Sequence, residues 1–147
     1  MLLTAGRYDE AASEYQHVPT HQGWEWARVC LGRARFGQGR TAEAIEVLSS
    51  VQEWGYLAYV YAKSGRQAEA EKLMAEAPIL HPDRRGAHQF ALVYAGFGDR
   101  EHTIERLERL ARTGPVRLGF TLNSPEFAFV RGDPRLKTLR EKVGLPE

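Results

Sequence analysis

Residues 36–48 read FGQGRTAEAIEVL, and residues 62–74 read AKSGRQAEAEKLM. Aligned without a gap, the two segments are identical at Gly39/Gly65, Arg40/Arg66, Ala42/Ala68, Glu43/Glu69 and Ala44/Ala70. The same frame recurs around Gly6 and Gly98, which places the four glycines 33, 26 and 33 residues apart. A repeat of this length is typical of supersecondary units that bury their apolar faces by stacking on one another. The chain is therefore predicted to be an array of such units.

Each unit is predicted to be a pair of helices joined at the glycine. Apolar residues recur at helical spacing before the glycine, and a second helix follows it. Examples are Trp54, Leu57, Ala58 and Tyr61 before Gly65, and Ala44, Ile45 and Leu48 after Gly39. Glycine suits the end of the first helix because a residue there often adopts a left-handed conformation. A small residue five positions later suits a close approach of two helices; these residues are Ala11, Ala44, Ala70 and Thr103.

The third unit carries a family pattern. It reads Trp54-Gly55-Tyr56-Leu57-Ala58-Tyr59-Val60-Tyr61 and continues through Gly65, Ala70, Met74 and Pro82. This stretch resembles the tetratricopeptide repeat, whose pattern is W-x2-L-G-x2-Y followed by a small alanine, a large apolar residue and a closing proline. Ala58 stands in place of the pattern's first glycine. Neighbouring units share the frame, so the resemblance covers roughly residues 1–115.

The resemblance implies an all-α fold, a right-handed superhelical solenoid of helix–turn–helix repeats in a single domain, residues 1–147. Its expected parts are a partial repeat at 1–22, repeats at 23–50, 51–82 and 83–115, and capping helices within 116–147. Ser124-Pro125 and Asp133-Pro134 each combine an N-cap residue with a proline. They predict helices near 125–131 and 134–143 that cover the exposed face of the last repeat.

Two places depart from the repeat pattern. The 26-residue spacing is short, and Ser50-Val51-Gln52-Glu53 resembles a capping box, so a new helix is predicted to begin almost where the previous one ends. The first unit lacks most of its first helix, which leaves Leu2 and Leu3 without a preceding repeat to cover them. We expect this edge to be covered by an upstream segment or by another chain, since the ends of such arrays need polar caps.

Composition and motifs argue against several functions. A formal charge of +1 gives no electrostatic case for nucleic acid or an anionic membrane, and one cysteine, Cys30, excludes a disulfide framework or thiolate cluster. His17 and His21 have metal-ligand spacing, but Pro19 between them breaks the helix that would align them. We therefore expect a cytoplasmic protein with no catalytic residue, metal or cofactor.

The first helix of each pair is expected to line a concave groove. Helical geometry directs the following side chains into this groove: Trp26, Val29, Cys30, Arg33, Phe36, Gln52, Tyr56, Tyr59, Lys63, Arg85, His88, Gln89 and Leu92. Eight of them are nominated for partner binding: Trp26, Arg33, Tyr56, Tyr59, Lys63, Arg85, His88 and Gln89. Tyrosine and arginine are enriched among the residues that dominate binding energy at interfaces. The predicted function is a non-catalytic protein–protein interaction module that holds a peptide or helix with some acidic or polar character. Only Arg85 matches the basic set with which some family members hold a C-terminal carboxylate, so that mode is not expected.

A second function stays open. The tail FAFVRGDPRLKTLREKVGLP (127–146) resembles the ends of repeat arrays that follow effector domains in bacterial regulators. The chain could therefore act by self-association, or by docking on its own upstream domains, through the edge around Leu2, Leu3 and Tyr8. Oligomeric state in solution separates the two functions.

Overall fold

A computed structural model describes residues 2–19, 24–80 and 86–145 of the chain. Within these ranges there are nine α-helices, one 3-10 helix and no strand, which confirms the all-α prediction. The helices are α1 (Tyr8–Tyr15), α2 (Glu25–Gly37), α3 (Thr41–Leu48), α4 (Trp54–Lys63), α5 (Gln67–Leu80), α6 (Ala87–Phe97), α7 (Arg100–Thr113), α8 (Pro115–Leu122), the 3-10 helix η2 (Pro125–Val130) and α9 (Pro134–Lys142).

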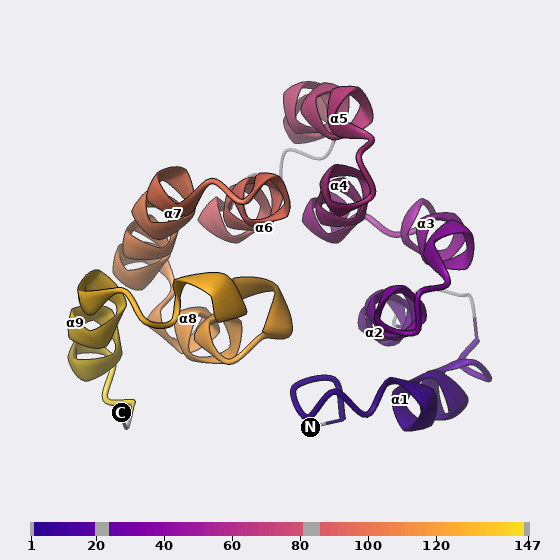
Figure 1. Cartoon of the computed structure of the whole chain (residues 1–147), viewed down its shortest axis with the longest axis horizontal. Helices are drawn as coiled ribbons and strands as arrows, with labels where there is room; N and C mark the ends of the chain where they lie inside the picture. Colours follow the sequence, from indigo (N-terminus) through magenta and orange to yellow (C-terminus); the bar gives the residue numbers. More distant parts are fainter. Residues whose placement is uncertain (1, 20–23, 81–85, 146–147) are drawn as a thin grey trace.

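The helices follow a curved path in two layers (Figure 1). Helices α2, α4 and α6 lie on the inside of the curve, and α3, α5 and α7 lie on the outside. Each inner helix packs against the outer helix that follows it in the chain, and α4 and α6 pack closely on each other. The C-terminal part turns back toward the inside, where α8 and η2 lie, while α9 packs on α7.

The turns between paired helices confirm the role predicted for the repeated glycines. Gly6, Gly39, Gly65 and Gly98 have φ angles of 71°, 77°, 78° and 70°. A side chain is disfavoured in this left-handed region, and glycine adopts it without a steric penalty. The small residues five positions later are all completely buried: Ala11, Ala44, Ala70 and Thr103. The repeated sequence therefore encodes the turn and the close contact that follows it.

Helices α4 and α6 approach so closely that two glycines are required between them. A Cβ atom on Gly55 would lie 2.6 Å from Oε1 and 2.9 Å from Cα of Gln89. A Cβ on Gly96 would lie 2.9 Å from Cβ of Ala62 and 3.0 Å from Cα of Tyr59. Backbone atoms cannot move aside as a side-chain tip can. Each helix thus places a glycine where the backbone of the other passes.

Replacing Gly55 with alanine is expected to lower the free energy of unfolding by about 1–3 kcal/mol, because the added methyl overpacks a site bounded by backbone. Urea unfolding measures the change. Gly132→Ala is the matched control, since no atom lies within 4 Å of its added Cβ, and it should stay within about 0.5 kcal/mol of the parent. Equal effects in the two variants would contradict the close approach of α4 and α6.

Several sequence predictions at the element ends were wrong. No helix begins at Ser50. Helix α3 ends at Leu48 with Ser49 as its C-cap, the Ser50 hydroxyl donates to the Val47 carbonyl at 2.5 Å, and α4 begins at Trp54. Helix α8 was not predicted, since Pro115 was interpreted as the close of a repeat and is also the first residue of a helix. The short helix predicted near 125–131 is confirmed over Pro125–Val130, where it is a 3-10 helix. The helix predicted near 134–143 is confirmed as α9, and Asp133 caps it by accepting from the Arg135 amide at 2.9 Å.

The N-terminal edge is also less open than predicted. Leu3 is buried in a cluster with Ala11, Ala12, Cys30 and Ala34, and Leu2 and Tyr8 pack against it. The segment before α1 folds back on α2, because the alanines leave room for a leucine side chain between the two helices. The first unit therefore covers much of its own apolar surface.

Candidate functional site

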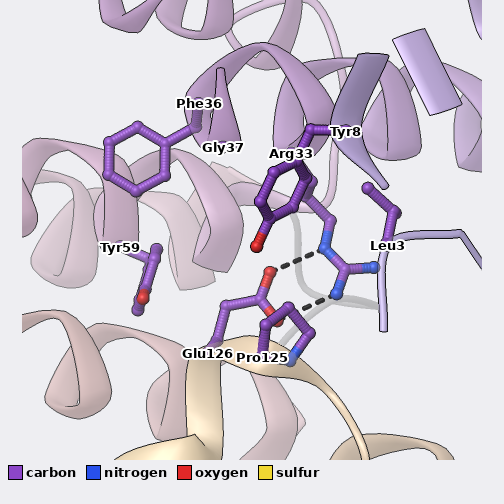
Figure 2. A pocket seen from close by; sticks show the side chains of 8 residues that line it. All are labelled: Leu3, Tyr8, Arg33, Phe36, Gly37, Tyr59, Pro125 and Glu126. Carbon is purple, nitrogen blue, oxygen red and sulfur yellow. Dashed lines mark hydrogen bonds and ion pairs between the residues drawn. The ribbon is translucent and has the colours of Figure 1, made fainter. Parts of the chain in front are cut away.

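A buried ion pair joins two distant parts of the chain on the inside of the curve. Arg33 on α2 donates from Nε and Nη2 to Oε1 and Oε2 of Glu126 on η2, at 2.7 and 2.8 Å. Only 10% of the arginine side chain and 6% of the glutamate side chain are exposed. The two parallel hydrogen bonds fix the relative orientation of both groups. Figure 2 shows the pair at the edge of a pocket.

The pair has a defined direction. The guanidinium carbon of Arg33 lies 4.8 Å from the centre of the Tyr56 ring, so its cation faces that ring. Burial by itself lowers the pKa of Arg33, but Glu126 and the neighbouring Tyr56 and Cys30 together hold that pKa above its ordinary value. Burial raises the pKa of the Tyr56 hydroxyl, and Arg33 acts on it more strongly than Glu126 does. The positive end of the pair therefore points toward Tyr56.

Glu126 also acts on Tyr59, which lines the same pocket. Burial raises the pKa of the Tyr59 hydroxyl, and the next largest cause is the Glu126 carboxylate, which raises it further. Arg33 lowers the pKa of Tyr59, but its effect is the smallest of the four that act on this group. The potential at Tyr59 is thus set by the carboxylate more than by the guanidinium.

A pocket of about 210 Å³ lies beside the ion pair. It is lined by Leu3, Tyr8, Arg33, Phe36, Gly37, Tyr59, Pro125 and Glu126. These residues come from the N-terminal segment, α1, α2, α4 and η2, which Figure 2 shows converging on one space. Phe36 and Tyr59 meet edge to face with their ring centres 6.0 Å apart. Gly37 lets the Tyr8 ring lie against α2, because a Cβ there would come within 2.4 Å of that ring.

A second row of side chains continues along the inner helices. Trp26 of α2 meets Tyr56 of α4 at 6.2 Å between ring centres, and Tyr56 meets His88 of α6 at 5.8 Å. Nδ1 of His88 lies 3.2 Å from the hydroxyl of Thr121 on α8. The Thr121 hydroxyl donates to the Arg117 carbonyl, so its oxygen can accept a hydrogen bond from the N–H of Nδ1. Helix α8 covers His88 at one end of this row, whereas Trp26 at the other end is exposed.

His88, nominated from the sequence as a groove residue for partner binding, is a buried histidine. Its Nε2 atom has no hydrogen-bond partner and no contact with solvent. Burial is the main cause that lowers its pKa, from 6.5 to about 3, and the cations of Arg117 and Arg33 lower it further. Burial therefore favours the uncharged imidazole in the folded protein.

Gln89 serves the contact between α4 and α6. Its Oε1 accepts a hydrogen bond from the Gly55 amide at 2.7 Å, and its Nε2 donates to the Glu53 carboxylate. The Glu53 carboxylate also lies 3.6 Å from Nη2 of Arg117 on α8. The Gln89 side chain on α6 thus pairs with a backbone N–H at the start of α4 that has no partner within its own helix.

The eight predicted groove residues consequently have different environments. Tyr56, His88 and Gln89 are buried, so these three side chains are not open to a partner in this conformation. Arg33 is paired with Glu126 and lines the pocket with it. Tyr59 lines the pocket, whereas Trp26 and Lys63 are exposed. Arg85 lies outside the described residues. The cause is the C-terminal segment: η2 reaches Arg33, and α8 covers His88.

The eight residues nominated for partner binding left out most of the pocket. Among them only Arg33 and Tyr59 line it; Tyr8, Pro125 and Glu126 come from elements that were assigned to an open edge and to a cap. Ser124-Pro125 marked the start of η2 in the sequence, but no local signal indicated that the next residue pairs with α2. Partners so far apart in sequence are brought together only by the curvature of the whole array.

Other chemical groups in the described ranges do not gather into a site. Burial raises the pKa of the Cys30 thiol, which disfavours its thiolate form. No three histidine, cysteine, aspartate or glutamate side chains among the described residues converge in a way that could hold a metal ion. None of the helices in those ranges is long and apolar enough to cross a membrane.

Comparison with known proteins gives no family assignment: no family model, curated protein or solved structure matches the chain.

Proposed function

We propose that this chain is a cytoplasmic, non-catalytic protein-interaction module, with helix pairs stacked as a right-handed tetratricopeptide-like superhelix. It holds part of a partner peptide on the inside of the curve. The observation that carries this proposal is the pocket lined by Tyr8, Phe36 and Tyr59 and by the Arg33–Glu126 pair. Aromatic side chains with polar tips offer a large contact area and hydrogen bonds at little entropic cost, as interface centres require.

The proposed contact is smaller than the continuous groove expected from the sequence. Helix α8 and η2 occupy part of the inner face, so a partner would insert one side chain into the pocket and lie along the exposed Trp26 and Lys63 nearby. The pocket volume far exceeds the roughly 10–15 Å³ that a cavity needs for one water molecule. A side-chain end group can therefore enter without unfolding the C-terminal segment.

A displayed random peptide library tests the proposal. Peptides are selected on the whole chain, and their dissociation constants are measured by fluorescence anisotropy for two variants. Tyr59→Ala removes a pocket wall and is expected to weaken binding at least tenfold. Tyr61→Ala lies on the same helix and is also half-buried, but its ring stacks on Arg66 outside the pocket, so binding should change less than twofold. Peptides that bind both variants equally well would refute a contact at the pocket.

Self-association through the N-terminal edge is the weaker candidate. It requires apolar side chains free of contacts, whereas Leu3 is buried and Leu2 and Tyr8 pack against the same cluster. Light scattering across a concentration series separates the two functions. A mass that rises with concentration, and returns to the monomer value in Leu2→Ser, would favour the edge.

A further inference from the structure

We propose that the pocket selects a primary carboxamide, the end group of a glutamine or asparagine side chain of the partner peptide. The inference rests on the proposed function and adds the chemistry of the group that is bound. It narrows the acidic or polar partner expected from the sequence to an uncharged polar one. Three properties of the pocket drawn in Figure 2 support it: its cancelled charge, its free donors and acceptors, and its walls.

The charges that line the pocket cancel. Among the described residues around it, only Arg33 and Glu126 are charged, and they form a bidentate ion pair at 2.7 and 2.8 Å. Only 10% and 6% of their side chains are exposed. A ligand cation or anion placed beside them would lose part of its hydration without gaining a counter-charge, which is costly in a largely buried site. The neutral pair therefore disfavours a charged end group of either sign.

The ion pair nevertheless keeps hydrogen-bonding capacity of both kinds. Glu126 engages two of the five N–H groups of the Arg33 guanidinium, which leaves three donors. Arg33 in turn engages two of the roughly four acceptor positions of the Glu126 carboxylate. A donor and an acceptor lie next to each other, since Nη2 of Arg33 and Oε2 of Glu126 are 2.8 Å apart. A purely apolar end group would displace water from these positions and leave them unpaired, which also costs free energy.

A primary carboxamide meets both conditions. It carries no charge, its oxygen accepts hydrogen bonds and its nitrogen donates two. Because the oxygen and the nitrogen are attached to the same carbon, they can reach a donor of Arg33 and an acceptor of Glu126 that lie next to each other. A hydroxyl has a single N–H-like donor, its O–H, and would leave more of the free acceptor positions unpaired.

The walls of the pocket suit the rest of such a side chain. Phe36 and Tyr59 meet edge to face with their ring centres 6.0 Å apart, and Tyr8 and Pro125 line further sides of the space. The methylene groups that carry the carboxamide can pack on these apolar surfaces, and amide resonance keeps the end group itself flat. The hydroxyls of Tyr8 and Tyr59 both donate and accept, so they too are partners for a neutral polar group.

Six small probes that differ only in their side chains test the selectivity: the N-acetyl N′-methylamides of L-glutamine, L-asparagine, L-glutamate, L-lysine, L-homoserine and L-homoleucine. The methylamide end ensures that only the first two carry a primary carboxamide. Each probe is titrated into the intact chain labelled with ¹³C at the tyrosine rings, and the Tyr8 and Tyr59 resonances report binding at the pocket. The tighter of the two carboxamide probes should bind at least fivefold more tightly than each of the other four. Equal binding of the apolar homoleucine probe, or a preference for a charged or hydroxyl probe, would overturn the inference.

A double variant locates the source of the selectivity. Arg33→Met with Glu126→Leu removes the free donors and acceptors together and leaves no buried charge unpaired, so the preference for the carboxamide over homoleucine should fall below twofold. Arg66→Met with Glu69→Leu is the matched control, because it removes an exposed bidentate pair that does not line the pocket. It should keep the full preference. A preference that survives the Arg33–Glu126 double variant would contradict the proposal, and the probe series on the parent chain tests it whether or not that variant folds.

The library peptides separate this inference from the proposed function. Peptides whose binding depends on Tyr59 should share a glutamine or asparagine, and replacing it with glutamate should weaken binding at least fivefold. Peptides whose binding depends on Tyr59, but which tolerate replacement of every glutamine and asparagine, would overturn the carboxamide inference alone. A complete lack of Tyr59-dependent binding would overturn the proposed function as well.

Discussion

Replacing Glu126 with alanine is expected to lower the free energy of unfolding by about 3–5 kcal/mol. The variant leaves the Arg33 guanidinium buried without its counter-charge, since only 10% of that side chain is exposed. The desolvation cost of the cation then remains while the attraction that offset it is lost. Urea unfolding followed by circular dichroism measures the change. The same variant should also loosen η2, because Glu126 is its link to α2.

A double variant distinguishes the cost of leaving Arg33 unpaired from the net contribution of the ion pair to the free energy of unfolding. Arg33→Met with Glu126→Leu replaces both charges by apolar groups of similar size, which often has little effect or stabilises. We expect it to recover most of the stability lost in Glu126→Ala. Glu101→Ala is the matched control, since it breaks an equally bidentate pair with Arg135 at 2.9 Å, but one whose glutamate is 72% exposed. It should cost much less than Glu126→Ala, because solvent screens an exposed pair. A similar loss in Glu101→Ala and Glu126→Ala would show that burial is not the cause.

Stability is expected to fall by about 1.4 kcal/mol for each pH unit between pH 6.5 and 4.5, because His88 resists protonation in the folded state. Its pKa is lowered from 6.5 to about 3 in the fold, mainly by burial and further by Arg117 and Arg33. In this window the unfolded chain binds a proton that the folded chain does not, so acid favours unfolding. Above pH 6.5 the imidazole is neutral in both states, and its contribution is constant. Tyr56 and Thr121, which also face the ring, remain uncharged throughout.

The variant His88→Gln isolates this effect. Glutamine can hydrogen-bond to Thr121 but does not titrate, so the slope between pH 6.5 and 4.5 should be reduced to a small fraction of that of the parent. The window is chosen above the range in which paired carboxylates such as Glu101 and Asp133 titrate; their pKa values are lowered by Arg135. Those groups contribute stability that is lost only at lower pH. An unchanged slope in the variant would assign the pH dependence to other groups.

The sequence by itself determined the helix pairs, because their signals are local. Glycine at a fixed position of the repeat predicts a left-handed backbone conformation there, and the φ angles of Gly39 and Gly65 confirm it. The buried alanines five residues later follow from the same frame, since a short turn fixes how the next helix leaves it. The ends of elements were less predictable. A serine such as Ser50 can stand at the start of one helix or just after the end of another, and so can a proline such as Pro115. The local pattern therefore does not distinguish a helix start from a helix end.

Only the tertiary structure decided which groove residues are accessible. Tyr56, His88 and Gln89 lie on inner helices, but whether such residues face solvent depends on what packs over them. Here α8 covers His88, and Arg33 pairs with Glu126, which lies 93 residues away in the sequence. No periodicity or cap encodes that contact, because it arises from small rotations between successive helix pairs that add up over the whole chain. The local sequence thus fixed the units, and their accumulated curvature made the pocket.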